Sequence, residues 1–103
     1  MRNLVCAAFL LISLLACQSE VEKYGQLYQQ KGDLANLEKA LSFLQTETDT
    51  AVIKSILGEP IDMGFDYRYL TEQVGENKCV IGAVFHIDEN GQIDDRWIGE
   101  ICE

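Results

Sequence analysis

Few side chains of this 103-residue chain have the types and the spacing that chemistry requires. His86 is the single histidine, and with Asp94 nearby we expect it to form an exposed cross-strand pair rather than a general base. The cysteine spacing matches no zinc site, no serine lies in a nucleophile motif, and no glycine-rich phosphate loop is present. We therefore predict no catalytic residue, no metal site, no cofactor and no small-molecule substrate.

Cys17 ends a short apolar run that starts behind the positive charge of Arg2. The run is shorter than the ~20 residues of a membrane span and is typical of a secretory signal peptide. The segment Leu14-Leu15-Ala16-Cys17 resembles the bacterial lipobox, which implies acylation of the Cys17 thiol and cleavage just before it. We predict a lipoprotein signal peptide over residues 1–16 and a lipidated tether over 17–23. The alternatives are an ordinary secretory peptide and a retained membrane anchor.

The count of cysteines agrees with a lipid on Cys17. Removal of residues 1–16 discards Cys6 and leaves an odd number of thiols in an oxidising compartment. If Cys17 carries lipid, Cys79 and Cys102 remain as one pair that can close as a disulfide. In such lipoproteins an Asp after the cysteine favours the inner membrane. Gln18 therefore suggests the periplasmic face of the bacterial outer membrane.

The length and the charge of the chain limit its partners. We expect residues 24–103 to form one small domain. A formal net charge of −9 gives no attraction to nucleic acid or to anionic lipid headgroups. Membrane attachment would then depend on the lipid at Cys17, and the remaining partner class is another envelope protein.

The apolar pattern predicts an α+β domain. Apolar residues at helical spacing predict helices over 21–30, 34–44 and 51–57. Asp33 can cap the second helix, Thr48 or Asp49 can cap the third, and Gly58 with Pro60 ends it. Alternation and β-branched residues predict strands over 65–70, 79–88 and 92–102. We expect two or three N-terminal helices packed on a three-stranded antiparallel sheet.

Two registers are open for the last hairpin. A two-residue turn at Asn90-Gly91 places Cys79 opposite Cys102. A three-residue loop that includes Glu89 shifts the pairing by one and gathers an apolar face on which Trp97 joins Phe85 and Ile93. It leaves His86 paired with Asp94 and Val84 paired with Arg96 outside. We favour the second register, because one face becomes consistently apolar. Both bring the two sulfurs together and predict a Cys79–Cys102 disulfide.

Several segments together resemble a lipoprotein family. They are Thr50 to Pro60, which ends in Leu-Gly-Glu-Pro, then Tyr67-Arg68-Tyr69, and Val84-Phe85 followed by Gly91-Gln92-Ile93. In this order they resemble the SmpA/OmlA (BamE-like) small outer-membrane lipoproteins, although Tyr67 stands where the family has tryptophan. The resemblance implies an ααβββ layer, which BLIP-like inhibitor modules share, and a partner in outer-membrane protein assembly. Residues 24–33 also resemble part of a tetratricopeptide repeat, but a single partial unit cannot bury its own faces.

Large aromatic residues are the candidate partner contacts. Phe65, Tyr67, Tyr69 and Trp97 are more than so small a core needs, so some of them should face outward. We expect Phe65 and Trp97 to pack beneath the helices and Tyr67 or Tyr69 to anchor a partner. The function that follows is that of a non-enzymatic outer-membrane lipoprotein that binds an envelope protein. The alternative is an inhibitor or regulator of a periplasmic enzyme.

Overall fold

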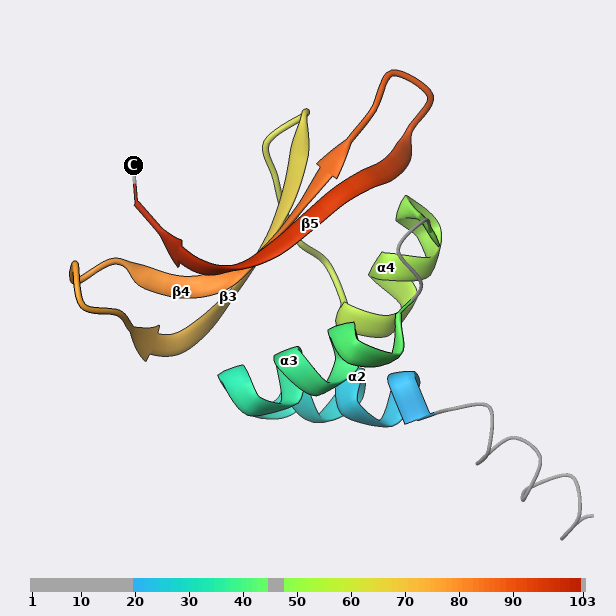
Figure 1. The fold of residues 1–103 in the computed structure, drawn as a ribbon. Coiled ribbons are helices and arrows are strands. Elements are labelled where there is room, and N and C mark those ends of the chain that lie inside the picture. Colours follow the sequence, from blue (N-terminus) through green and yellow to red (C-terminus); the bar gives the residue numbers. More distant parts are fainter. Residues whose placement is uncertain (1–19, 45–47, 103) are drawn as a thin grey trace, which may run out of the picture.

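The computed structural model describes residues 20–44 and 48–102 (Figure 1). These residues form three helices and five strands. In chain order they are α2 (Glu20–Lys31), α3 (Leu34–Phe43), β1 (Thr48–Asp49), α4 (Thr50–Leu57), β2 (Ile61–Asp62), β3 (Asp66–Val74), β4 (Val80–Ile87) and β5 (Gln92–Ile101).

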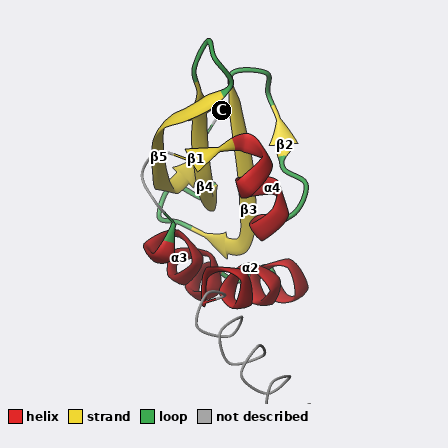
Figure 2. Ribbon diagram, turned by 90° about the vertical axis from the view of Figure 1, so that its right-hand side faces the viewer, coloured by secondary structure: helices red, strands yellow, loops and turns green. Residues whose placement is uncertain are grey.

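The strands form one antiparallel sheet in the order β1-β5-β4-β3-β2, and the helices gather on one side of it (Figures 1 and 2). The α+β class is confirmed, whereas the predicted three-stranded sheet is wrong. The long strands β3, β4 and β5 are the three expected ones, and β1 and β2 extend the sheet at its two edges. A strand of two residues is too short to show a period, so the sequence pattern could not reveal it.

Local hydrogen bonds explain where the helices begin and end. Asp33 caps α3 by accepting from the Asn36 amide at 3.3 Å, and Asp49 caps α4 by accepting from the Val52 amide at 2.9 Å. Gly58, at φ 88°, ends α4, as predicted. Helix α2 begins at Glu20, so it includes residues that we had assigned to the tether.

The core lies between the helices and one face of the sheet. Tyr69 stands at its centre, with ring centroids 6.3 Å from Tyr28 and 5.8 Å from Phe85, both in edge-to-face geometry. The Tyr28 hydroxyl donates to the Leu70 carbonyl at 2.6 Å, and the Tyr69 hydroxyl donates to the Gly58 carbonyl at 2.8 Å. Burial raises the pKa of both phenols, that of Tyr28 to about 12, so both remain protonated donors. These two bonds join the helical layer to the sheet.

Helices α2 and α4 cross closely at Gly25. A Cβ atom there would meet the backbone oxygen and the side chain of Ile56. The same carbonyl accepts a hydrogen bond from Gln29 at 2.8 Å, so it is fixed in position. We expect Gly25→Ala to lower the free energy of unfolding by about 1–3 kcal/mol, as overpacking does, measured by urea denaturation. Gln26→Ala, at an exposed position of the same helix, is the control. Equal stability of the two variants would contradict the close crossing.

The β4–β5 hairpin combines both of the registers that the sequence allowed. Next to the turn, Ile87 pairs with Ile93 and Gly91 has φ 76°, which confirms the three-residue loop. A β-bulge at Asp94 then shifts the pairing by one residue. Beyond it Arg96 pairs with Phe85 and Trp97 with Val84, so the favoured register is wrong along most of β5. One extra residue moves every later side chain to the opposite face.

The shifted register brings the ends of the hairpin together. Val80 pairs with Ile101, so the next residues outward are Cys79 and Cys102. Their Cα atoms are 5.3 Å apart and their sulfurs are bonded. The predicted disulfide is confirmed.

Candidate functional site: the open face of the sheet

The face of the sheet that points away from the helices carries exposed apolar side chains. We call this surface the open face. Its large side chains are 37–57 % exposed, and they are Ile61, Met63, Phe65, Leu70 and Trp97. They come from β2 and the segment after it, from β3 and from β5, so the sheet assembles the surface from distant parts of the chain. A cluster of this kind on a small domain is typical of an interaction site.

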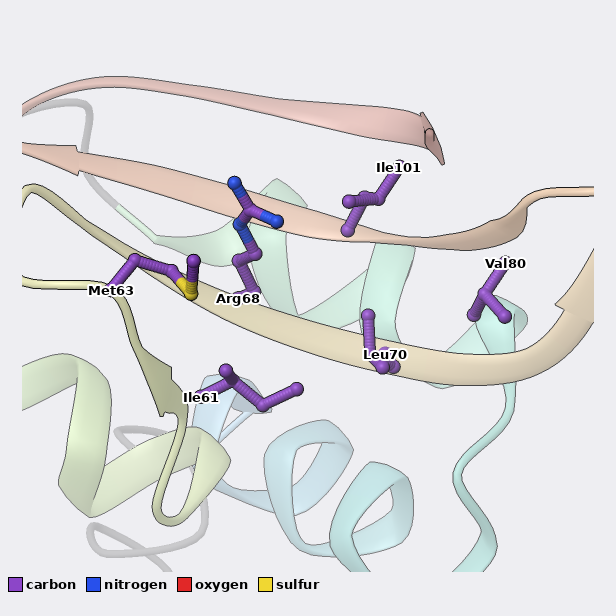
Figure 3. A pocket seen from close by; sticks show the side chains of 6 residues that line it. All are labelled: Ile61, Met63, Arg68, Leu70, Val80 and Ile101. Atoms are coloured by element: carbon purple, nitrogen blue, oxygen red, sulfur yellow. The ribbon is translucent and has the colours of Figure 1, made fainter. Parts of the chain in front are cut away.

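The open face has two hollows that meet at Arg68 and Ile101. The first has a volume of about 390 Å³. Its lining is apolar except for Arg68, which lies among the side chains drawn in Figure 3 (Ile61, Met63, Leu70, Val80 and Ile101). The second hollow, of about 380 Å³, includes Phe65, Val84 and Trp97. The two hollows together give the face a contoured surface that a protruding side chain can enter.

Two glycines leave part of the open face without side chains. Gly82 and Gly99 pair with each other across β4 and β5. A Cβ atom at Gly82 would meet the Tyr69 carbonyl, so a side chain is excluded there. A Cβ atom at Gly99 would lie 3.5 Å from the Trp97 ring, which shows that this ring extends along the strand over the glycine. An aromatic ring that covers a strand glycine shields the backbone and keeps its own face available.

An ion pair lies at the centre of this apolar surface. The Nε of Arg68 donates to Asp66 Oδ1 at 3.2 Å, and the two side chains are 16 % and 8 % exposed. Both residues lie on β3, two positions apart, so they share the open face. The pair leaves little net charge at the centre while keeping a guanidinium beside both hollows.

The structure reverses the predicted roles of the aromatic residues. Tyr67 and Tyr69 are 7 % and 3 % exposed and lie in the core beneath the helices, so they are not available as partner anchors. Phe65 and Trp97, which we expected beneath the helices, are 57 % and 45 % exposed on the open face. The bulge at Asp94 explains why Trp97 lies on the open face rather than in the core. Phe65 precedes the first residue of β3, so strand alternation does not decide its direction.

The sequence prediction also missed the contribution of Ile61 and Met63. Both follow Pro60 in a segment without helical or strand period. The sequence indicated their role in one way: they are two large apolar residues in a stretch with no predicted core partner. The short strand β2 places Ile61 beside Arg68 and so adds both residues to the rim of the first hollow.

His86 and Asp94 form the predicted exposed pair, with 2.6 Å between His86 Nδ1 and Asp94 Oδ1. The hydrogen bond to Asp94 raises the pKa of His86 above its ordinary value of 6.5. The contact therefore stabilises the fold fully below pH 6.5 and is lost as the pH rises through the folded-state pKa.

We expect an NMR titration of the single histidine to give a pKa above 6.5, because the carboxylate favours the charged ring. In Asp94→Asn the pKa should fall toward the ordinary value. Asp88→Asn, in the adjacent turn, is the control. A wild-type pKa of 6.5 or lower would show that the pair does not form in solution.

The predicted lipid anchor, a metal site and a membrane-spanning helix are the remaining features to compare with the structure. Cys17 and the residues before it lie outside the described residues. Within the described residues, no three His, Cys, Asp or Glu side chains gather as a metal site would require. In that same part of the chain, no helix is long and apolar enough to cross a membrane.

The chain matches no family model, no curated protein and no solved structure.

Proposed function

We propose that this chain is a non-enzymatic, lipid-anchored protein of the bacterial envelope that binds another protein through the open face. The observation that carries the proposal is the group of exposed apolar side chains around Trp97 on a sheet face that no helix of the described chain covers. Tryptophan is enriched among residues that dominate binding energy, and leaving such a surface in water is costly. The Cys79–Cys102 disulfide agrees with an oxidising compartment such as the periplasm.

The location belongs to the same proposal. Acylation of Cys17 would hold the domain at the periplasmic face of the outer membrane, with the chain from Gln18 onward as its tether. The resemblance to the SmpA/OmlA (BamE-like) lipoproteins supports a partner in outer-membrane protein assembly. The segments that carry the resemblance lie in α4, β3 and the β4–β5 hairpin.

An inhibitor or regulator of a periplasmic enzyme is the second candidate. The observation that favours it is the pair of hollows beside Arg68, since a loop that protrudes from an enzyme could insert a side chain there. Such an inhibitor would form a one-to-one complex with one enzyme.

Site-specific photo-crosslinking in intact envelopes tests the proposed function. A photoreactive residue at Trp97 should capture a partner, whereas the same residue at Glu38, exposed on α3, should not. Capture of barrel-assembly subunits would support an assembly role, and capture of one enzyme would support the inhibitor role. Equal capture from both positions, or none at Trp97, would overturn the open face as the contact.

We expect Cys17→Ala to move the protein from the membrane fraction to the soluble periplasmic fraction, because the charge of the chain gives no other attraction to lipid. Fractionation of cells followed by immunoblotting measures this. Cys6→Ala, inside the predicted signal peptide, is the matched control and should stay in the membrane fraction. Retention of Cys17→Ala in the membrane would contradict the lipid anchor.

A further inference from the structure

A polar hollow lies at the junction of α2, α4 and β3, on the side of the sheet that carries the helices (Figure 2). Its volume is about 300 Å³. The lining comes from the last turns of α2 and α4, from the residues that follow those turns, and from Tyr69 of β3. None of these residues lines either hollow of the open face. The polar hollow is therefore separate from the surface that carries the proposed function.

The hydrogen-bond donors around this hollow are already used within the fold. The hydroxyls of Tyr28 and Tyr69 donate to backbone carbonyls, and so does the side-chain amide of Gln29. The backbone amides of Gly32 and Gly58 donate to carbonyls four residues earlier, at 2.6 and 2.9 Å. The lining therefore offers a ligand mainly hydrogen-bond acceptors.

Acceptors remain available at the same place. The side-chain nitrogen of Gln29 donates to the Ile56 carbonyl, so the side-chain oxygen lies on the other side of the amide, toward Gly58. A Cβ atom at Gly58 would be 3.1 Å from this oxygen. The last turn of an α-helix has carbonyl groups without partners inside the helix, and it carries partial negative charge. Both α2 and α4 end at this hollow, so two such ends meet there.

Glu59 adds a full negative charge to these acceptors. Its side chain is exposed just beyond the end of α4 and forms no ion pair among the described residues. Burial, and after it the charge of Glu59, raises the pKa of the Tyr69 phenol, so this charge acts on the lining. The nearest lysines along the chain do not fill the hollow. Lys54 extends over the Tyr67 ring, 5.2 Å from its centroid, and Lys31 is not among the lining residues.

A primary ammonium group matches this lining. It has one positive charge, three hydrogen-bond donors and no acceptor. A guanidinium is a planar fork that suits a pair of oxygens in one plane, whereas the ammonium donors can rotate toward oxygens that come from several elements. A divalent metal ion would require more carboxylates than the described residues bring together.

We propose that the polar hollow binds the ammonium group of an amine or of a lysine side chain. Glu59 is the counter-ion, and the acceptors are the Gln29 side-chain oxygen and the carbonyls at the ends of α2 and α4. Binding here does not depend on what the open face binds, because the two sites share no residue.

Titration of the purified protein with n-butylammonium at constant ionic strength tests the site, because this probe is the side chain of lysine alone. We expect saturable shifts of the Gly32 and Gly58 amide signals in ¹H–¹⁵N NMR spectra. The matched probe is n-butanol, which has nearly the same shape without the charge, and it should give no saturable shift.

The variant Glu59→Gln tests the counter-ion, since it keeps the size of the side chain and removes its charge. Binding of n-butylammonium should weaken about tenfold. Glu38→Gln, at an exposed position of α3, removes the same charge elsewhere and should leave the affinity nearly unchanged. Circular dichroism of both variants checks the fold.

Two further probes distinguish the sources of the ammonium group. N-acetyl-lysine methylamide carries this group only on its side chain, as a lysine within a protein does, whereas putrescine is a free diamine. Binding of N-acetyl-lysine methylamide would show that a lysine of a partner protein can enter the hollow. Binding of putrescine without it would restrict the site to free amines, and either outcome supports an ammonium site.

Three results would overturn the proposal. They are the absence of saturable shifts with all three amines, shifts with n-butanol as large as those with n-butylammonium, and a folded Glu59→Gln variant that binds n-butylammonium as tightly as the unmodified protein. None of these results depends on whether Trp97 captures a partner, so the ammonium site and the proposed function fail separately.

Discussion

Replacement of Phe85 by alanine is expected to lower the free energy of unfolding by about 3–5 kcal/mol. The side chain is fully buried at the centre of β4 and its ring meets Tyr69 edge to face. Its removal loses apolar burial and leaves a cavity that the two-layer core cannot close, because the neighbouring Tyr69 ring is held by the hydrogen bond from its hydroxyl to the Gly58 carbonyl. Urea denaturation followed by circular dichroism measures the loss. A domain of this size has little stability to spare, so the variant should be largely unfolded at about 37 °C.

Trp97→Ala is the matched control, since it removes a larger aromatic side chain from the same sheet. Trp97 is 45 % exposed and its ring lies near Gly99 of its own strand, so its loss should cost roughly 1 kcal/mol. The comparison discriminates directly between the two registers of the hairpin. If Trp97→Ala destabilised the fold as much as Phe85→Ala, the indole would belong to the core and the bulge at Asp94 would be wrong.

Loss of the Cys79–Cys102 disulfide is expected to cost roughly 3 kcal/mol, because the bond closes a loop with a sequence separation of 23 residues in the unfolded chain. It also holds the end of β5, which among the described residues pairs with β4 alone at Ile101. For a domain of this size the melting temperature should fall by more than about 10 °C. Thermal unfolding with and without reductant measures the change.

The variant with both Cys79→Ser and Cys102→Ser supplies the control. It should melt at the temperature of the reduced wild type and should not respond to reductant. Free thiols at both positions in the native protein would show that the bond does not form, and an unchanged melting temperature would show that the hairpin end is stable without it.

The two layers of the fold explain why one face of the sheet is exposed. The described helices pack on one face of the sheet, where Tyr67, Tyr69 and Phe85 are buried. A sheet of this kind has two faces, and the described chain has no further element to cover the second one. Its apolar residues are therefore exposed in the described part of the chain, and the two glycines and the Arg68–Asp66 pair give that surface its shape and polarity.

Much of this architecture could be predicted from the sequence, because the signals are local. Helix periodicity, the caps at Asp33 and Asp49 and the stop at Gly58 depend on residues within one or two turns of each other. The hairpin at Gly91 and the exposed contact of His86 with Asp94 depend on a short turn. The disulfide followed because both hairpin registers bring its two sulfurs together.

Only the tertiary structure decided which side of the sheet each residue of β5 occupies. One bulged residue at Asp94 exchanges the two faces, moves Trp97 out of the core and turns Arg96 toward the Leu44 carbonyl, 2.9 Å away. Alternation has a period of two, so it predicts that faces exist but not which face is buried. That choice depends on how α2, α3 and α4 pack against the sheet, and this packing depends on contacts between residues far apart in the chain. For the same reason the open face, built from three separate segments, could not be read from any one of them.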